Sequence, residues 1–173
     1  MHICTFHMVP GPLTIHAGID KLQGAHSLDW RGGPGEVACW WLPDFVEDPR
    51  ADGAVLGREL RALINDAVAD LATGARCGAF LSGGLDSSTV AGVLATVKPA
   101  DADTFSIGFD VPGYDETGYA RIAAERFGTR QHVRYVDADD VLAAVQTISA
   151  HYDEPFGNSS AIPAYYCAQL ARE

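Results

Sequence analysis

Apolar residues recur at intervals of three and four along much of the chain, and shorter apolar runs lie between these stretches. The first pattern predicts amphipathic helices, and short runs bounded by glycine, proline or aspartate predict buried strands. The expected helices cover residues 54–71, 87–97, 116–127 and 139–151, and a last helix, from 164, is still running at 173. The expected strands cover residues 77–81, 104–109 and 132–136.

The order of these elements predicts an α/β fold. Helices of ten or more residues separate the strands, and connections of that length are typical of parallel strands joined by right-handed crossovers. We therefore expect a parallel sheet with helices on both faces, as half of a doubly wound sheet. The expected spatial order of the strands is third, second, first, which leaves the first strand at an edge.

Residues 1–45 have a different texture, with proline, glycine and short apolar runs. They predict a β-ribbon with arms at 27–30 and 36–40 around a turn at 31–35. A ribbon of this size has no core of its own. Residues 46–53 are acidic and turn-prone, as in a linker.

The amino-acid composition excludes some classes of function. The net charge of −11 argues against nucleic-acid binding, and 47% hydrophobic with 20% charged residues is typical of a globular protein. The four cysteines form no CxxC pair, so a zinc site is unsupported. Neither a signal peptide nor a membrane-spanning run is visible, and we expect a soluble, cytoplasmic protein that binds no membrane.

The candidate chemistry lies in the string Ser82–Ser88, SGGLDSS, between an expected strand and an expected helix. Backbone amides and the positive end of a helix dipole would face an anion there. The glycines allow close approach of a phosphate, and the carboxylate of Asp86 could hold magnesium on phosphate oxygens. The string has no lysine, so it is not the loop of the P-loop NTPases. The plainer alternative is a turn in which Ser82 or Asp86 caps the helix.

This string resembles the pyrophosphate-binding loop of the ATP-pyrophosphatase superfamily, and most closely that of glutamine-dependent asparagine synthetases. Similarity runs from about Val9 to the C-terminus and includes TFSIGF at 104–109 and the segment from Asp153 to Tyr166. The resemblance implies an adenine-nucleotide α-hydrolase-like fold for residues 54–173, as the N-terminal half of a synthetase domain. It implies that residues 1–45 are the remnant of the end of a glutaminase domain.

The resemblance also implies a reaction. ATP would activate a carboxylate, with aspartate the expected one, as an acyl-adenylate with release of pyrophosphate, and ammonia would then attack the acyl carbon. The implied cofactors are ATP and Mg²⁺, with Asp86 at the metal. The residues implied to hold ATP or pyrophosphate are Leu81, Ser82, Gly83, Gly84, Asp86, Ser87, Ser88 and Ile107, of which Leu81 and Ile107 would border the adenosine.

Two departures from the family pattern bear on these expectations. The family glutaminase uses an N-terminal cysteine whose amine serves as base, whereas Cys4 is internal here and is interpreted as a structural thiol, so we expect no glutamine hydrolysis. Ammonia would come from glutamine through a domain that is missing here. Asn158 stands where many relatives have aspartate, and Ser159 or Ser160 could simply cap the following helix.

A second glycine loop of the family is absent from the sequence. We therefore expect a fragment or one member of a split pair, inactive alone, whose partner is the missing half or another copy. Two alternatives stay open: a synthetase for another amide (a β-lactam, a peptide macrocycle or a sugar amide), and a non-catalytic ATP- or AMP-binding module.

Overall fold

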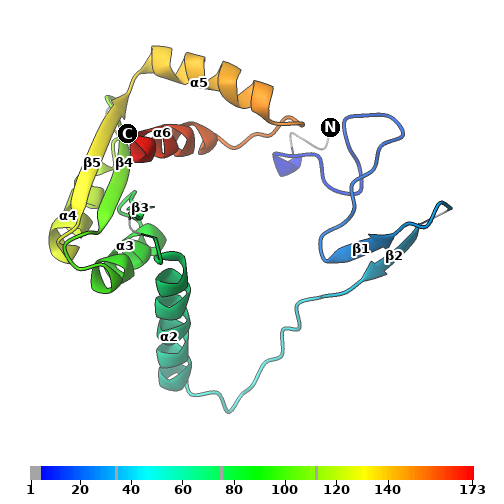
Figure 1. Cartoon of the computed structure of the whole chain (residues 1–173), viewed down its shortest axis with the longest axis horizontal. Helices are drawn as coiled ribbons and strands as arrows, with labels where there is room; N and C mark the ends of the chain where they lie inside the picture. Colours follow the sequence, from blue (N-terminus) through cyan, green and yellow to red (C-terminus); the bar gives the residue numbers. More distant parts are fainter. Residues whose placement is uncertain (1–4, 34, 75, 112) are drawn as a thin grey trace. The chain divides into compact units, whose positions relative to one another are not determined.

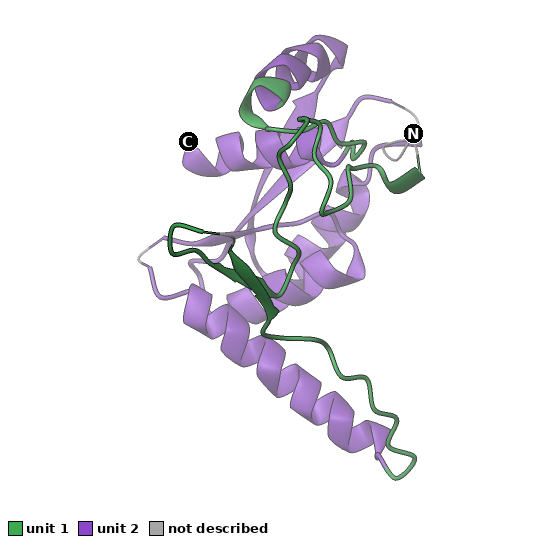
Figure 2. Ribbon diagram, turned by 90° about the vertical axis from the view of Figure 1, so that its right-hand side faces the viewer, with its two compact units in different colours: residues 1–50, 149–159 green, residues 51–148, 160–173 purple. Residues whose placement is uncertain are grey.

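The computed structural model describes residues 5–33, 35–74, 76–111 and 113–173. Cys4, and position 34 in the predicted turn, lie outside these ranges. The chain divides into two compact units, residues 1–50 with 149–159 and residues 51–148 with 160–173, coloured separately in Figure 2. In chain order the elements are β1 (His26–Asp29), β2 (Glu36–Cys39), α2 (Gly53–Leu71), β3 (Gly78–Phe80), α3 (Leu85–Val97), β4 (Asp103–Phe109), α4 (Thr117–Phe127), β5 (Arg130–Val136), α5 (Ala138–His151) and α6 (Ala161–Arg172).

The second unit contains a parallel sheet in the order β3-β4-β5, so the predicted fold class and strand order are confirmed (Figure 1). β3 pairs with β4 along one side only and lies at the edge of the described sheet. β4 is the central strand, and its register aligns Phe105 with Phe80 on one side and with His132 on the other.

Helices cover both faces of this sheet because side chains along β4 alternate between the two faces. On one face, Ala79 and Leu81 pack with the buried residues of α3 and α4. On the other face, Ile107 and Phe109 pack against α5 and α6 through a cluster that includes Tyr166. Thr104 and Ser106, on the α3–α4 side, are the buried polar residues of the strand.

α2 shows what the periodicity could and could not predict. The helix is present, and Asp52 caps its start by accepting a hydrogen bond from the Ala54 amide at 2.7 Å. It ends at Leu71, as the periodicity predicts, with Ala72 as the cap residue. None of its residues is buried among the described parts of the chain, although its apolar positions recur as a core-facing stripe would.

At the amino ends of β4 and β5, Asp103 joins two basic side chains. Its carboxylate accepts hydrogen bonds from Arg130 at 2.5 and 2.8 Å, and the Nε2 atom of His132 lies 2.8 Å away. The hydrogen bond from Arg130 is the main cause that lowers the pKa of Asp103 to about 2. These charges lie at the opposite end of the strands from Ser82.

The first unit contains the predicted ribbon. β1 and β2 pair antiparallel, with His26 opposite Cys39 and Asp29 opposite Glu36. Within the part of the chain that the structure describes, no helix has both the length and the apolar character needed to cross a membrane.

Candidate functional site

The site begins where β3 ends. Leu81 follows the strand directly and continues its pairing, since its amide donates to the Phe105 carbonyl at 2.8 Å. The hydroxyl of Ser106 donates to the Leu81 carbonyl at 2.7 Å. Leu81 is 2% exposed, so it fixes the start of the loop to the sheet core.

Gly83 is required by both conformation and space. Its φ is +87°, in the region that side chains rarely adopt. A Cβ atom at this position would lie 2.5 Å from backbone atoms of Tyr119 and Ala120 in α4. The loop therefore rests directly on the backbone of the next helix.

The serines of the loop form a small network. The hydroxyls of Ser82 and Ser87 lie 3.0 Å apart, and Ser87 Oγ also lies 3.3 Å from both the Ser82 amide and the Gly84 carbonyl. The Gly84 amide donates to Ser82 Oγ at 3.3 Å. These bonds tie the beginning of the loop to the first turn of α3 and hold two hydroxyl groups at its N-terminus.

The N-terminus of α3 is open. Its cap residue is Gly84, and no side chain caps the helix, so capping by Ser82 or Asp86 does not occur. The amides of Leu85, Asp86 and Ser87 have no hydrogen-bond partner among the described residues. Free amides at the positive end of a helix form a site for an anion.

Ser88 is placed differently from the other serines. Its amide donates to the Gly84 carbonyl at 3.0 Å, within the helix ladder. Its Oγ is buried and has no hydrogen-bond partner among the described residues. The hydroxyl of Ser88 is therefore an unsatisfied polar group in the first turn of α3.

Asp86 projects from the first turn of α3 and is exposed. Among the described residues no group of three or more histidine, cysteine or acidic side chains could hold a metal ion. A single carboxylate suits Mg²⁺ when phosphate oxygens and water supply the remaining ligands. The donor set therefore fits a magnesium ion that arrives with a phosphate ligand.

A cavity of about 370 Å³ lies beside the loop, against the C-terminal half of β4 and between the first turns of α4 and α6. Leu81, Ser82 and Ile107 line it, so the structure brings these three predicted residues together. The other predicted residues, Gly83, Gly84, Asp86, Ser87 and Ser88, belong to the loop and the first turn of α3 and do not line this cavity.

Several residues that line the cavity were not predicted as site residues from the sequence, among them Ser106, Tyr114, Glu116 and Cys167. Residues after the carboxyl end of β4 could have been found from the rule that ligands bind at that end of parallel strands. Cys167 comes from α6, and burial raises the pKa of its thiol to about 11. At neutral pH the thiol is therefore protonated.

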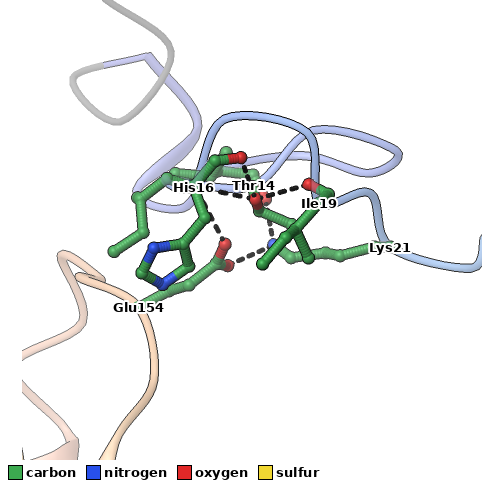
Figure 3. A network of polar contacts seen from close by, with 7 residues as sticks. Thr14, His16, Ile19, Lys21 and Glu154 are labelled. Atoms are coloured by element: carbon green, nitrogen blue, oxygen red, sulfur yellow. Dashed lines mark hydrogen bonds and ion pairs between the residues drawn. The ribbon is translucent and has the colours of Figure 1, made fainter.

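The segment 149–159 belongs to the first unit, where Glu154 is already engaged (Figure 3). Its carboxylate forms an ion pair with Lys21 and accepts a hydrogen bond from the Ile15 amide at 3.3 Å. The hydrogen bond from Lys21 is the main cause that lowers the pKa of Glu154. Lys21 Nζ also donates to the Val9 carbonyl at 2.8 Å. The network thus joins this segment to residues 9–21.

Comparison with known proteins gives consistent matches. The family model for asparagine synthase matches residues 59–173. A Methanocaldococcus jannaschii protein, provisionally named glutamine-hydrolysing asparagine synthetase 2, is 37% identical over 170 residues, which are 95% of this chain and 32% of that protein. Glutamine-hydrolysing asparagine synthetase 1 of Bacillus subtilis is 28% identical over 170 residues, 98% of this chain and 27% of that protein. The chain thus spans between about a quarter and a third of the length of these relatives.

Among solved structures, similarity extends to a glutamine-dependent NAD⁺ synthetase from Acinetobacter baumannii in complex with ADP. The TM-score is 0.47 and the sequence identity 17%, over 73% of this chain and 25% of that one.

Proposed function

The chain belongs to the asparagine synthase family, and on this premise we propose that it acts in an ATP-dependent ligase that forms an amide. In the proposed reaction a carboxylate oxygen of aspartate attacks the α-phosphorus of ATP. The bond between the α- and β-phosphates breaks, pyrophosphate leaves, and an acyl-adenylate forms. Ammonia then attacks the acyl carbon, AMP leaves, and the nitrogen loses a proton to give the amide.

The observation that carries this proposal is the open N-terminus of α3, without a side-chain cap. Negative charge grows on the departing pyrophosphate, and preorganised amides with a helix dipole stabilise such charge most when it develops. In the proposed roles, Gly83 and Gly84 let the backbone approach the phosphates, and Ser82, Ser87 and Ser88 add hydroxyl donors. The fixed contact of Gly83 with α4 keeps this arrangement rigid.

The cavity beside the loop supplies the second part of the proposed site. Leu81 and Ile107 line it and would border the adenosine. The cavity is near the size range of small-ligand pockets, and its lining is largely apolar. A base in the cavity and phosphates at α3 would place the nucleotide across the carboxyl ends of β3 and β4, the usual end for ligands in open α/β sheets.

Asp86 is the residue proposed to hold magnesium, because its exposed carboxylate stands in the first turn of α3. When bound, the ion would neutralise phosphate charge. Ammonia is proposed to come from glutamine, because the names of the relatives describe glutamine hydrolysis.

The test is calorimetric titration of the full chain with pyrophosphate and with ATP, each with and without MgCl₂. We expect binding of both ligands, and the Asp86→Asn variant should lose roughly tenfold in affinity, only when magnesium is present. Asp66→Asn, an exposed carboxylate on α2, is the matched control and should bind as the wild type does. Equal binding by both variants would remove Asp86 from its role, and absence of binding by the wild type would reject the proposed function.

Exchange of labelled pyrophosphate into ATP tests the adenylate step, and it is measured with the remainder of a synthetase domain supplied in trans, because this chain spans only part of the length of its relatives. Exchange that depends on aspartate would support it, and exchange driven by another carboxylate would replace aspartate as the substrate. Nucleotide binding without exchange for any carboxylate tested would favour the binding module instead.

A further inference from the structure

The walls of the cavity beside the loop are unlike a phosphate site. Four aromatic residues, Phe80, Phe105, Phe109 and Tyr114, are among its lining residues. No lysine, arginine or histidine is among its described lining residues. Aromatic and aliphatic walls without a cation suit a flat, uncharged ring, because stacking and burial of apolar surface are then the main attractions.

Most polar groups in this lining already have partners. The hydroxyl of Ser106 donates to the Leu81 carbonyl at 2.7 Å and lies 3.1 Å from Nε2 of Gln131, which donates to it. The hydroxyl of Thr117 lies 2.9 Å from an Asp115 carboxylate oxygen and 3.1 Å from the Tyr135 hydroxyl. These two hydroxyls therefore have little capacity left for a ligand.

The hydroxyl of Tyr114 also has no partner among the described residues, but Glu116 differs from every other lining residue. It is the one charged side chain among the described lining residues, and its carboxylate has no hydrogen-bond or ion-pair partner within the described chain. It occupies the N-cap position of α4 without making a side-chain cap hydrogen bond. Its side chain is therefore not needed for the helix and is available to a ligand in the cavity.

We propose that Glu116 selects the base of the bound nucleotide, by accepting a hydrogen bond from a ring amino group. This inference rests on the proposed function. An ionised carboxylate only accepts hydrogen bonds. The 6-amino group of adenine is a donor, whereas hypoxanthine carries a carbonyl oxygen at the same position, which would face the carboxylate with like partial charge. Such a contact weakens the binding of hypoxanthine as well as strengthening the binding of adenine.

The test compares the dissociation constants of ATP and ITP, which differ in this amino group, for wild type, Glu116→Gln and Glu125→Gln. The wild type should bind ATP at least roughly tenfold more tightly than ITP, because a polar site rejects a ligand that leaves it unpaired. Glu116→Gln should bring the two within roughly threefold, since an amide can donate as well as accept. Glu125 lies on the same helix, is exposed and lies outside the cavity, so Glu125→Gln should keep the wild-type ratio.

Circular dichroism would verify that both variants keep the helix content and the melting temperature of the wild type. Equal affinity of the wild type for ATP and ITP would overturn the assignment of Glu116, and so would a Glu116→Gln variant that keeps the wild-type ratio. In both cases magnesium-dependent binding of pyrophosphate would remain, and the proposed function would stand. If the wild type bound neither nucleotide, both the proposed function and this inference would fall.

Discussion

Replacing Asp103 by asparagine should destabilise the parallel sheet and change how its stability depends on pH. The Asp103 side chain is 13% exposed and lies between Arg130 and His132 at the amino ends of β4 and β5. The hydrogen bond from Arg130 outweighs the opposing effect of desolvation and lowers the pKa from 3.8 to about 2.

The size of the effect follows from this difference in pKa. At about 1.4 kcal/mol for each tenfold change, a pKa lowered from 3.8 to about 2 would correspond to about 2.5 kcal/mol. That figure is an upper limit, because Arg130 is 61% and His132 41% exposed and water screens both charges. We therefore expect about 1 kcal/mol, or a lower melting temperature by about 2–4 °C in a chain of this size.

The sign of the pH dependence follows from the lowered pKa. The contribution of Asp103 is fully present above the ordinary pKa, because the carboxylate is then charged in both states. It is lost as the pH falls from about 4 to about 2, since the unfolded state takes up the proton first. The Asp103→Asn variant has no carboxylate at this position and should lack this part of the acid destabilisation.

Thermal unfolding followed by circular dichroism, at pH 7 and in steps from pH 5 to pH 2, would measure both effects. Asp66→Asn is the control for loss of one exposed charge, and its curve should run parallel to the wild type. The reasoning fails if Asp103→Asn melts with the wild type at pH 7, or if its melting temperature falls with acid as steeply as that of the wild type.

Three further outcomes are expected. Gly83→Ala should cost about 2 kcal/mol or more in unfolding free energy and weaken pyrophosphate binding in titration, because its Cβ would lie 2.5 Å from the α4 backbone at a positive φ. Lys21→Met should raise the pKa of Glu154 toward its ordinary value, seen as a shift to higher pH in the carboxyl titration by NMR. Iodoacetamide at pH 8 should label exposed Cys39 far faster than Cys167, which is 7% exposed with a pKa of about 11, as mass spectrometry would show.

Each of these three predictions has a control variant or a result that would contradict it. Gly118→Ala places a methyl group on α4 where no atom lies within 4 Å and should leave stability unchanged or raise it. A Gly83→Ala variant as stable as Gly118→Ala would contradict the steric argument. An unchanged Glu154 titration in Lys21→Met, or equal labelling of the two cysteines in folded protein, would refute the other two predictions.

The sequence allowed prediction of features that depend on neighbouring residues. The passage from Leu81 through Gly83 to Asp86 is a local strand, glycine turn and helix start, and local rules describe it. The parallel direction of the strands followed from the lengths of the connections, and their order followed from the doubly wound pattern. The amphipathic pattern of α2 predicted its helix, but periodicity carries no information about what a helix packs against.

The remainder depends on residues far apart in the chain. Glu116 and Cys167 reach the same cavity from α4 and α6, and only the packing of both helices on β4 brings them together. Asp103 meets Arg130 because of the register between two strands. The contact of Glu154 with Ile15 joins residues 139 positions apart, and no local pattern marks such a pair.

The contact between Gly83 and α4 has a consequence for the order of folding. The loop rests on the backbone of Tyr119 and Ala120, so we expect the docking of that later helix to help fix the positions of its amides. We therefore expect a peptide of residues 78–97, which contains every loop residue, to bind pyrophosphate more weakly than the whole chain does. A phosphate ligand that binds only the state in which α4 is docked would stabilise that state by mass action. Binding of the ligand should therefore slow hydrogen exchange in α4, even without direct contact between the ligand and this helix.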